Sequence, residues 1–156
     1  MRPTDGPALG HFYAALSPAS RYSRFMGFSR GMDDDRALSL CTPDHRHDEG
    51  LVAVLAGPRP ELIVGHLCLQ PAGRKTVELA VAVSDEHQGL GIGRRLMEGA
   101  VRWAMENGFE QITATAFADN WRVLRLLSAT PYAPRVLPAD AGTVEVIIPL
   151  SPPATD

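Results

Sequence analysis

The stretch HQGLGIGRRLMEG (residues 87–99) places three glycines directly in front of a helical pattern. Gly89, Gly91 and Gly93 alternate with apolar residues, and from Ile92 onward apolar side chains recur at helical spacing. A helix N-terminus has unpaired N–H groups and about half a positive charge, and glycines let a ligand approach them closely. The stretch therefore predicts either an anion-binding turn or a tight strand-to-helix turn without a ligand, and we expect positive φ angles at Gly91 and Gly93.

The composition predicts one ordinary globular domain, since the chain has 156 residues, of which 45% are hydrophobic and 21% charged. We expect a single domain over residues 1–150 and a flexible tail over residues 151–156. The net charge of −3 gives no general attraction to nucleic acid or membrane, so neither is expected as a partner. The sequence has no signal-peptide pattern and no apolar run of the ~20 residues that span a bilayer. Cys41 and Cys68 form no CxxC motif, so we expect free thiols and a cytoplasmic location.

The periodicity of the apolar residues predicts a mixed α/β (α+β) fold. Helices are expected at residues 7–16, from Pro18 through Met26, after Asp33–Asp35, at 91–107 and after a cap at Asp119 or Asn120. Strands are expected at 50–57, 61–70, 76–83, 110–117 and 143–150, with turns at 57–60 and 71–75. This order predicts a central, mostly antiparallel sheet with one strand–helix–strand crossover and flanking helices.

Two common phosphate-binding motifs do not fit the glycine stretch. A dinucleotide fingerprint needs a glycine at its sixth position. That position is Arg94 when counted from Gly89 and Leu96 when counted from Gly91, so neither frame fits. A P-loop needs a Gly-Lys pair, which the sequence lacks. The pattern that remains is Gln-x-x-Gly-x-Gly, formed by Gln88, Gly91 and Gly93 between a predicted strand and a predicted helix.

This Gln-x-x-Gly-x-Gly pattern resembles the acetyl-CoA signature of the GNAT superfamily of N-acetyltransferases. The resemblance implies the GNAT fold, acetyl-CoA as co-substrate, no metal, and transfer of an acetyl group to an amine. It implies a pyrophosphate site formed by Gln88, Gly89, Leu90, Gly91, Ile92, Gly93, Arg94 and Arg95. It also implies that the backbone of Val81, Ala82 and Val83 binds the pantetheine arm, and that Asn120 and Arg125 contribute from the next helix. Asn120 alone also fits a simple N-cap, and Arg125 fits a solvated side chain equally well.

A second stretch, LSPASRYSRFMGF (residues 16–28), resembles the LSPxSxYxRFF motif in the acetyltransferase domain of bacterial Pat-type protein lysine acetyltransferases. VELAVAVSDEHQGLGIG (residues 77–93) resembles the same family, and the likeness extends from about Leu16 to Tyr132. It implies that protein lysine side chains are the acceptors and that Glu78 is the general base. Pat-type enzymes often carry large additional domains, for which this chain has no matching sequence.

The chemistry of amine acetylation is consistent with a base at Glu78. A lysine amine has a pKa of about 10.4, so it must lose a proton before it attacks a thioester, and a backbone N–H near Val81 can stabilise the oxyanion. Glu78 shares a strand face with Ala80 and Ala82, whose small side chains leave room for a substrate. Alternatively, Glu78 is a solvent-exposed polar position on an alternating strand. Glu86 and His87 have suitable chemistry, but they lie in the loop expected to hold phosphates.

The sequence departs from the superfamily at the seventh residue after Asn120, where many members have a tyrosine that protonates the leaving thiolate. This chain has Leu127 there, and Tyr132 is not aligned with it. Two alternatives therefore stay open: a small-molecule amine acetyltransferase, and a catalytically degenerate acyl-CoA-binding regulatory module. HRHDE (residues 45–49) is predicted to be a solvated turn rather than a metal site, and His66 a half-buried strand histidine. The acceptor, the oligomeric state and the proton donor to the thiolate are left open.

Overall fold

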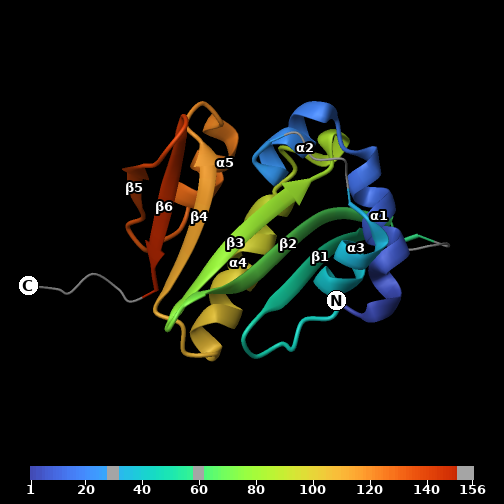
Figure 1. The fold of residues 1–156 in the computed structure, drawn as a ribbon, viewed down its shortest axis with the longest axis horizontal. Helices are drawn as coiled ribbons and strands as arrows, with labels where there is room; N and C mark the ends of the chain where they lie inside the picture. The colour runs from blue at the N-terminus through green and yellow to red at the C-terminus, as the bar shows by residue number, and fades with distance from the viewer. Residues whose placement is uncertain (28–31, 58–61, 151–156) are drawn as a thin grey trace, which may run out of the picture.

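The computed structural model describes residues 1–27, 32–57 and 62–150. One six-stranded sheet, in the order β1-β2-β3-β4-β6-β5, carries helices on both faces (Figure 1). The strands are β1 (Glu49–Leu55), β2 (Leu62–Gly73), β3 (Thr76–Val83), β4 (Gln111–Phe117), β5 (Arg135–Pro138) and β6 (Thr143–Pro149). The helices are α1 (Gly6–Ala15), α2 (Pro18–Phe25), α3 (Asp34–Leu40), α4 (Ile92–Glu106) and α5 (Trp121–Ser128), with 3₁₀ turns η1 (Pro3–Asp5) and η2 (Asp85–His87).

The strand pairs are antiparallel except for β3 and β4, which are parallel and connected by α4. A parallel neighbour requires a crossover connection, and α4 supplies it. The predicted mixed fold with a single strand–helix–strand crossover is therefore confirmed.

Three helices begin where the sequence predicts a cap or a helix start, and of the two candidates Asp119 and Asn120 it is Asn120 that caps α5. The side-chain oxygens of Ser17, Asp33 and Asn120 each accept a hydrogen bond from the backbone N–H three residues further along, at the starts of α2, α3 and α5. Pro18 follows Ser17 at the first helical position, where its missing N–H costs no helical hydrogen bond. Two of these caps, Ser17 and Asn120, therefore set where the helices that line the site described below begin.

Two hydrophobic clusters fill the two faces of the sheet. The larger one packs α4 and α5 against side chains such as Leu67 and Leu79, and the smaller one packs α1 against Ile63. Because successive strand residues point to opposite faces, His66 and Cys68 on β2 face the α1 side. The sheet thus has an α4 face and an α1–α2 face, and this division positions the site described below.

The structure corrects three local predictions. β2 continues through Pro71 to Gly73, so the expected turn at 71–75 is restricted to residues 74–75. Pro71 is tolerated because its missing N–H would point away from β3, toward β1, whose pairing already ends at Leu69. β5 was not predicted, since its four residues are all exposed and show no alternation. His66 is completely buried rather than half-buried.

Two predictions concern residues that lie outside the described ranges: part of the turn at 57–60 and the flexible tail at 151–156. Within the described ranges, no helix is both long enough and apolar enough to cross a membrane.

Candidate active site

The central feature of the site is a gap between two neighbouring strands. β3 and β4 are paired only from Thr76–Gln111 to Glu78–Thr113, whereas β3 remains paired with β2 as far as Val83. Beyond Glu78 the two strands diverge (Figure 1). A cleft of about 940 Å³ occupies this region, lined by β3, β4, α2, α5 and the start of α4.

The cleft edge of β3 presents unpaired backbone groups. Ser84 N–H donates to the carbonyl of Val64 on β2 at 2.8 Å. Since N–H and C=O directions alternate along an antiparallel strand, Val81 and Val83 direct their N–H groups away from β2 and toward the gap, beyond the last β3–β4 pair of Glu78 and Thr113. An extended ligand that carries amides can pair with such an edge as an additional strand would.

The glycine loop opens at the start of α4. Gly89 and Gly91 have φ angles of 78° and 82°, and Gly91 is the N-cap of α4 with no side-chain capping bond. The first N–H groups of this 15-residue helix are therefore available to an anion. Gly93 differs from the expectation because it lies within the helix, where a Cβ would come within 3.1 Å of Leu126 Cδ2 on α5. Its missing side chain allows α4 and α5 to approach closely.

The cleft brings together most of the residues that the sequence analysis selected. Those that line it are Val81, Ala82, Val83, Gln88, Gly89, Gly91, Ile92, Gly93, Arg94, Asn120 and Arg125. Leu90 and Arg95 do not line it, and Leu90 is 69% exposed. Arg94 Nε donates to Glu98 Oε1 at 3.0 Å on the exposed surface of α4, so a carboxylate already accompanies its charge.

Glu78 occupies the last paired position before β3 and β4 separate. Its side chain is exposed and shares the α1–α2 face with Ala80 and Ala82, both of which line the cleft. Glu78 itself is not among the cleft-lining residues, and it has no hydrogen bond or ion pair with any described residue. The Glu78 carboxylate thus lies at the edge of the gap without a partner among the described residues.

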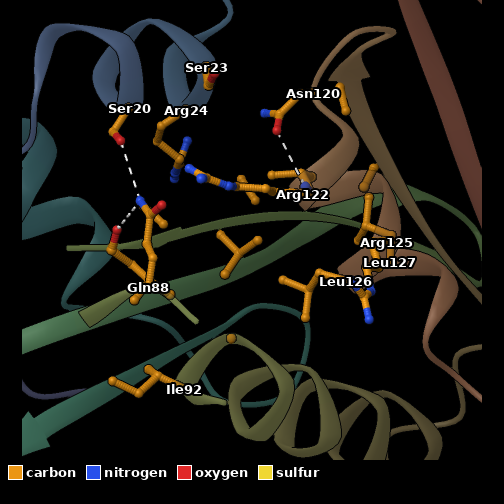
Figure 2. Close-up of a pocket in the computed structure, with 18 of the residues that line it drawn as sticks. Ser20, Ser23, Arg24, Gln88, Ile92, Asn120, Arg122, Arg125, Leu126 and Leu127 are labelled. Carbon is orange, nitrogen blue, oxygen red and sulfur yellow. Dashed lines mark hydrogen bonds between the residues drawn. The ribbon is translucent and has the colours of Figure 1, made fainter. Parts of the chain in front are cut away.

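α2 forms a wall of the cleft that was not predicted to contribute. Ser20, Ser23 and Arg24 line it from that side (Figure 2). Gln88 Nε2 donates to Val83 O at 3.1 Å and to Ser20 Oγ at 3.5 Å, which connects α2 to the end of β3 (Figure 2). The sequence contained a signal for this wall, because Ser20 and Arg24 are both positions of the LSPxSxYxRFF-like motif.

Asp85 fixes the start of α2. Its carboxylate accepts hydrogen bonds from Ser17 N (2.9 Å), Ser17 Oγ (2.8 Å) and Ser20 Oγ (2.7 Å). Partial burial raises the pKa of Asp85, but the hydrogen bonds from Ser17 and Ser20 outweigh this effect and hold the pKa below its ordinary value. The contact joins residues 68 positions apart and keeps α2 beside the glycine loop.

A buried polar pair lies beneath α2. Tyr13 Oη and His66 Nδ1 are 2.7 Å apart, and His66 Nε2 has no partner in the described part of the chain. Burial, followed by the positive charge of Arg24, lowers the pKa of His66 to about 3. Burial raises the pKa of Tyr13 to about 12. Both groups are therefore neutral at pH 7.

Comparison with known proteins identifies the family. The model of the acetyltransferase (GNAT) family matches residues 14–128. The chain belongs to this family. Acetyltransferase PA5475 of Pseudomonas aeruginosa is 27% identical over 148 residues, and the match covers 92% of this chain and 78% of that protein.

Solved GNAT structures have the same fold as this chain. The GNAT domain of S. lividans PAT has a TM-score of 0.84 at 22% identity, over 96% of this chain and 87% of that domain. The structure of yncA from Salmonella typhimurium with acetyl-CoA has a TM-score of 0.71 at 19% identity, over 99% of this chain and 94% of that one. The chain is accordingly a GNAT-family N-acetyltransferase, and acetyl-CoA is its co-substrate.

The residues of the cleft fit this co-substrate. The unpaired edge of β3 offers partners to the amides of a pantetheine arm, and the start of α4 offers N–H donors to a pyrophosphate. The tyrosine of many GNAT members is replaced by the buried Leu127, which lines the cleft. Tyr132 does not substitute for it, because its hydroxyl donates to Met105 Sδ of α4 at 3.2 Å.

Proposed function

We propose that this GNAT acetyltransferase acetylates lysine side chains of proteins by direct attack of the ε-amine, with Glu78 as general base. The observation that supports the acceptor class best is the location of the Pat-like motif. Its residues form α2, and Ser20 and Arg24 of that motif line the cleft beside β3. A motif whose side chains lie at the site contributes to ligand contacts rather than only to folding. The similarity in fold to the GNAT domain of S. lividans PAT is consistent with this proposal.

For the co-substrate, we assign the glycine loop and the first turn of α4 to the pyrophosphate and the edge of β3 to the pantetheine arm. Asn120 caps α5 with its side-chain oxygen, and its amide nitrogen is left to donate to the ligand. Arg125 lines the cleft from the same helix and adds positive charge for the phosphates. When bound, acetyl-CoA supplies the thioester from which the acetyl group is transferred.

The chain's own contribution to the reaction is removal of a proton and polarisation of a carbonyl. Glu78 receives the proton of the acceptor ammonium, directly or through a water molecule, because no described residue occupies its carboxylate. The backbone N–H of Val81 is directed into the gap, where it can donate to the acetyl carbonyl oxygen. Ala80 and Ala82 leave room on the same face for the acceptor.

The acceptor class is tested with labelled acetyl-CoA and a host lysate. The purified protein is incubated with both, and the proteins and the small molecules are then analysed separately by mass spectrometry. Label on lysine residues of proteins is the expected result, and label on metabolites alone would make the small-molecule alternative correct. A Glu78→Gln sample run in parallel identifies label that arises without the enzyme's chemistry. If CoA is released neither with the proteins nor with the small molecules of the lysate, the remaining alternative is the regulatory acyl-CoA-binding module.

We also propose that residues 1–150 act as one domain and that the protein works in the cytoplasm. Cys41 and Cys68 are both free and buried, which suits a compartment in which thiols stay reduced.

A further inference from the structure

Arg24 is a half-buried cation on the cleft side of α2 (Figure 2). Its guanidinium carbon lies 5.7 Å from the ring centre of Tyr13 and 5.2 Å from that of Phe25. Its Nη2 donates to Cys68 Sγ at 3.3 Å. Burial raises the pKa of the Cys68 thiol, which is therefore a neutral and weak acceptor. The guanidinium is thus held in place by two rings and a thiol.

Arg24 has no counter-charge among residues 1–27, 32–57 and 62–150. None of the ion pairs in those ranges includes it. Its Nε is shielded from water and has no hydrogen-bond acceptor there. The neighbouring Tyr13 and His66 are neutral at pH 7, as described above. A guanidinium that is partly removed from water without an anion is unfavourable, so an external anion would stabilise this arrangement.

The site proposed above for the phosphates of acetyl-CoA belongs to a helix on the other face of the sheet, so these phosphates are not the expected anion. Cys68, which Arg24 contacts, is the register partner of Ala80, and both lie on the α1–α2 face. The N-terminus of α4, with the glycine loop, belongs to the helix that packs on the opposite face through residues such as Leu67 and Leu79. Arg24 is therefore on the same face as Glu78, the face to which the proposed mechanism assigns the acceptor.

A second guanidinium comes from the opposite wall. Arg122 lies in the first turn of α5 and lines the cleft. Figure 2 shows its side chain extending from α5 across the cleft toward Arg24. Its guanidinium carbon lies 5.3 Å from the ring centre of Trp121, and it has no ion pair with a residue in the described ranges. Two arginines thus border one volume, and no described carboxylate pairs with either of them.

We infer that the acceptor carries a carboxylate near its reacting amine, and that Arg24, with Arg122 opposite, binds this carboxylate. The inference rests on the proposed amine acetylation and narrows its substrate class. An acceptor of this kind matches the charges of the site, with its ammonium toward Glu78 and its carboxylate toward the arginines. Guanidinium groups bind carboxylates with paired, charge-assisted hydrogen bonds. A lysine beside an acidic residue in a protein and a free amino acid both present this chemistry.

The test compares acceptors that differ only in the carboxylate. The first set consists of peptides with a single lysine, each with one Glu at a different position beside that lysine. Each peptide is paired with one that has Gln in place of the Glu. The other set is free lysine and lysine amide. We expect kcat/KM to be about tenfold or more higher for the carboxylate member of at least one pair. Discrimination among the peptides indicates a protein acceptor, discrimination by free lysine alone indicates a small molecule, and both results support a bound carboxylate.

Two variants locate the effect. Arg24→Met keeps an unbranched side chain against Tyr13 and Phe25 but removes the charge, so the preference should disappear through a higher KM while the affinity for acetyl-CoA is retained. Arg36→Met is the matched control, because the Arg36 guanidinium carbon lies 4.8 Å from the Phe25 ring centre but does not line the cleft. It should keep the preference. Thermal unfolding of both variants verifies that they are folded.

Equal rates with both members of every pair would overturn the inference, as would an equal loss for both members in Arg24→Met. A binding measurement separates this outcome from failure of the proposed function. N-ε-acetylated Glu and Gln peptides and N-ε-acetyl-lysine with its amide are titrated calorimetrically into the protein with CoA. Tighter binding of a carboxylate member, lost in Arg24→Met, supports the inference even if no amine is acetylated. Equal affinities in every pair reject it, whereas absent acetylation rejects only the proposed transfer.

Discussion

At the scale of single residues, a substitution of Glu78 gives the most direct test of the proposed general-base mechanism. Glu78→Gln keeps the size and the hydrogen-bonding groups but removes the ability to accept a proton at neutral pH. General-base catalysis typically supplies about 10²–10⁴-fold, so turnover should fall within that range. Steady-state kinetics measures turnover, and calorimetry should give an acetyl-CoA affinity near that of the wild type.

Glu106→Gln provides the control for this change, since Glu106 is an exposed carboxylate on the last turn of α4. It should leave turnover unchanged. A loss of less than about threefold in Glu78→Gln, far below the range for a general base, would mean that another group removes the proton.

The glycines of the loop differ from one another in what a side chain would do. Gly91 has a φ of 82° and open space around it, so a valine there would fit but would be held in an unfavourable backbone conformation. We expect Gly91→Val to distort the start of α4, to weaken acetyl-CoA binding by about tenfold or more and to lower stability by about 1–3 kcal/mol. Calorimetric titration and urea unfolding measure the two effects. An unchanged affinity would exclude the loop as the pyrophosphate site.

Gly93→Val is the informative partner variant. Its backbone is helical, so the cost comes instead from Leu126, which a Cβ would approach to 3.1 Å. We expect this variant to separate α5 from α4 and to lose stability as well as affinity. Both glycines were predicted to have a positive φ, but Gly93 is helical, and the packing of α5 against α4 is what excludes a side chain there.

At the scale of secondary-structure elements, the placement of α2 depends on Asp85. Asp85→Ala removes the acceptor of hydrogen bonds from Ser17 and Ser20. These bonds are largely solvent-exposed, so the expected loss of stability is modest, about 1–2 kcal/mol. Because α2 carries Arg24, the KM for the acceptor should rise more than the dissociation constant for acetyl-CoA.

Urea unfolding and kinetics with both substrates varied measure these changes, and Asp140→Ala, in an exposed turn, is the control. If Asp85→Ala raised both constants equally, α2 would have no separate role on the acceptor side.

The sequence predicted elements well where local signals determine them. Ser17, Asp33 and Asn120 identified helix starts because a cap acts within three residues. β5 was missed because an exposed four-residue strand owes its existence to pairing with β6. The glycine loop was recognisable from one continuous stretch.

The other wall of the site was not recognisable in the same way. Arg24 reaches the cleft only because α2 is held against a loop far along the chain. The full burial of His66 likewise follows from a contact with Tyr13, 53 residues away. Contacts of this range leave no periodic pattern in the sequence.

At the scale of the whole molecule, the buried histidine predicts how stability depends on pH. The folded-state pKa of His66 is about 3, whereas an unfolded chain has a histidine pKa of about 6.5. Between these values the unfolded state binds more protons, so stability falls as the pH is lowered from about 6.5 toward 3, by up to about 1.4 kcal/mol per pH unit. Asp85, whose folded pKa is lowered, adds to the loss only below about pH 4.

Urea unfolding at several pH values from 7.5 to 5 measures this dependence. The wild type should lose stability across that interval, and His66→Gln, which has no titrating group, should lose most of the slope. Equal slopes in the two proteins would assign the dependence to other groups.

The distribution of lysine across the molecule gives a further prediction. Lys75 is the only lysine in the sequence. It lies at the turn before β3, where its Nζ donates to Glu110 Oε1. Three strand residues, roughly 10 Å, separate it from Glu78, and the turn points away from the cleft end of β3. We therefore expect negligible self-acetylation. Intact-mass measurement after long incubation with acetyl-CoA checks this, and an adduct of about 42 Da that is absent from Lys75→Arg would contradict it.

The separation of β3 from β4 has a consequence for the free protein. The N–H groups of Val81 and Val83 lie on an internal strand of the sheet but have no strand partner on the β4 side, where the pairing ends at Glu78 and Thr113. They should exchange with deuterium as fast as amides of an edge strand, and acetyl-CoA should protect them selectively. A ligand at a hundred times its dissociation constant stabilises a fold by about 2.7 kcal/mol. The co-substrate would therefore act as the missing strand of the sheet. The supply of acetyl-CoA would then determine the amount of folded enzyme as well as the rate of the reaction.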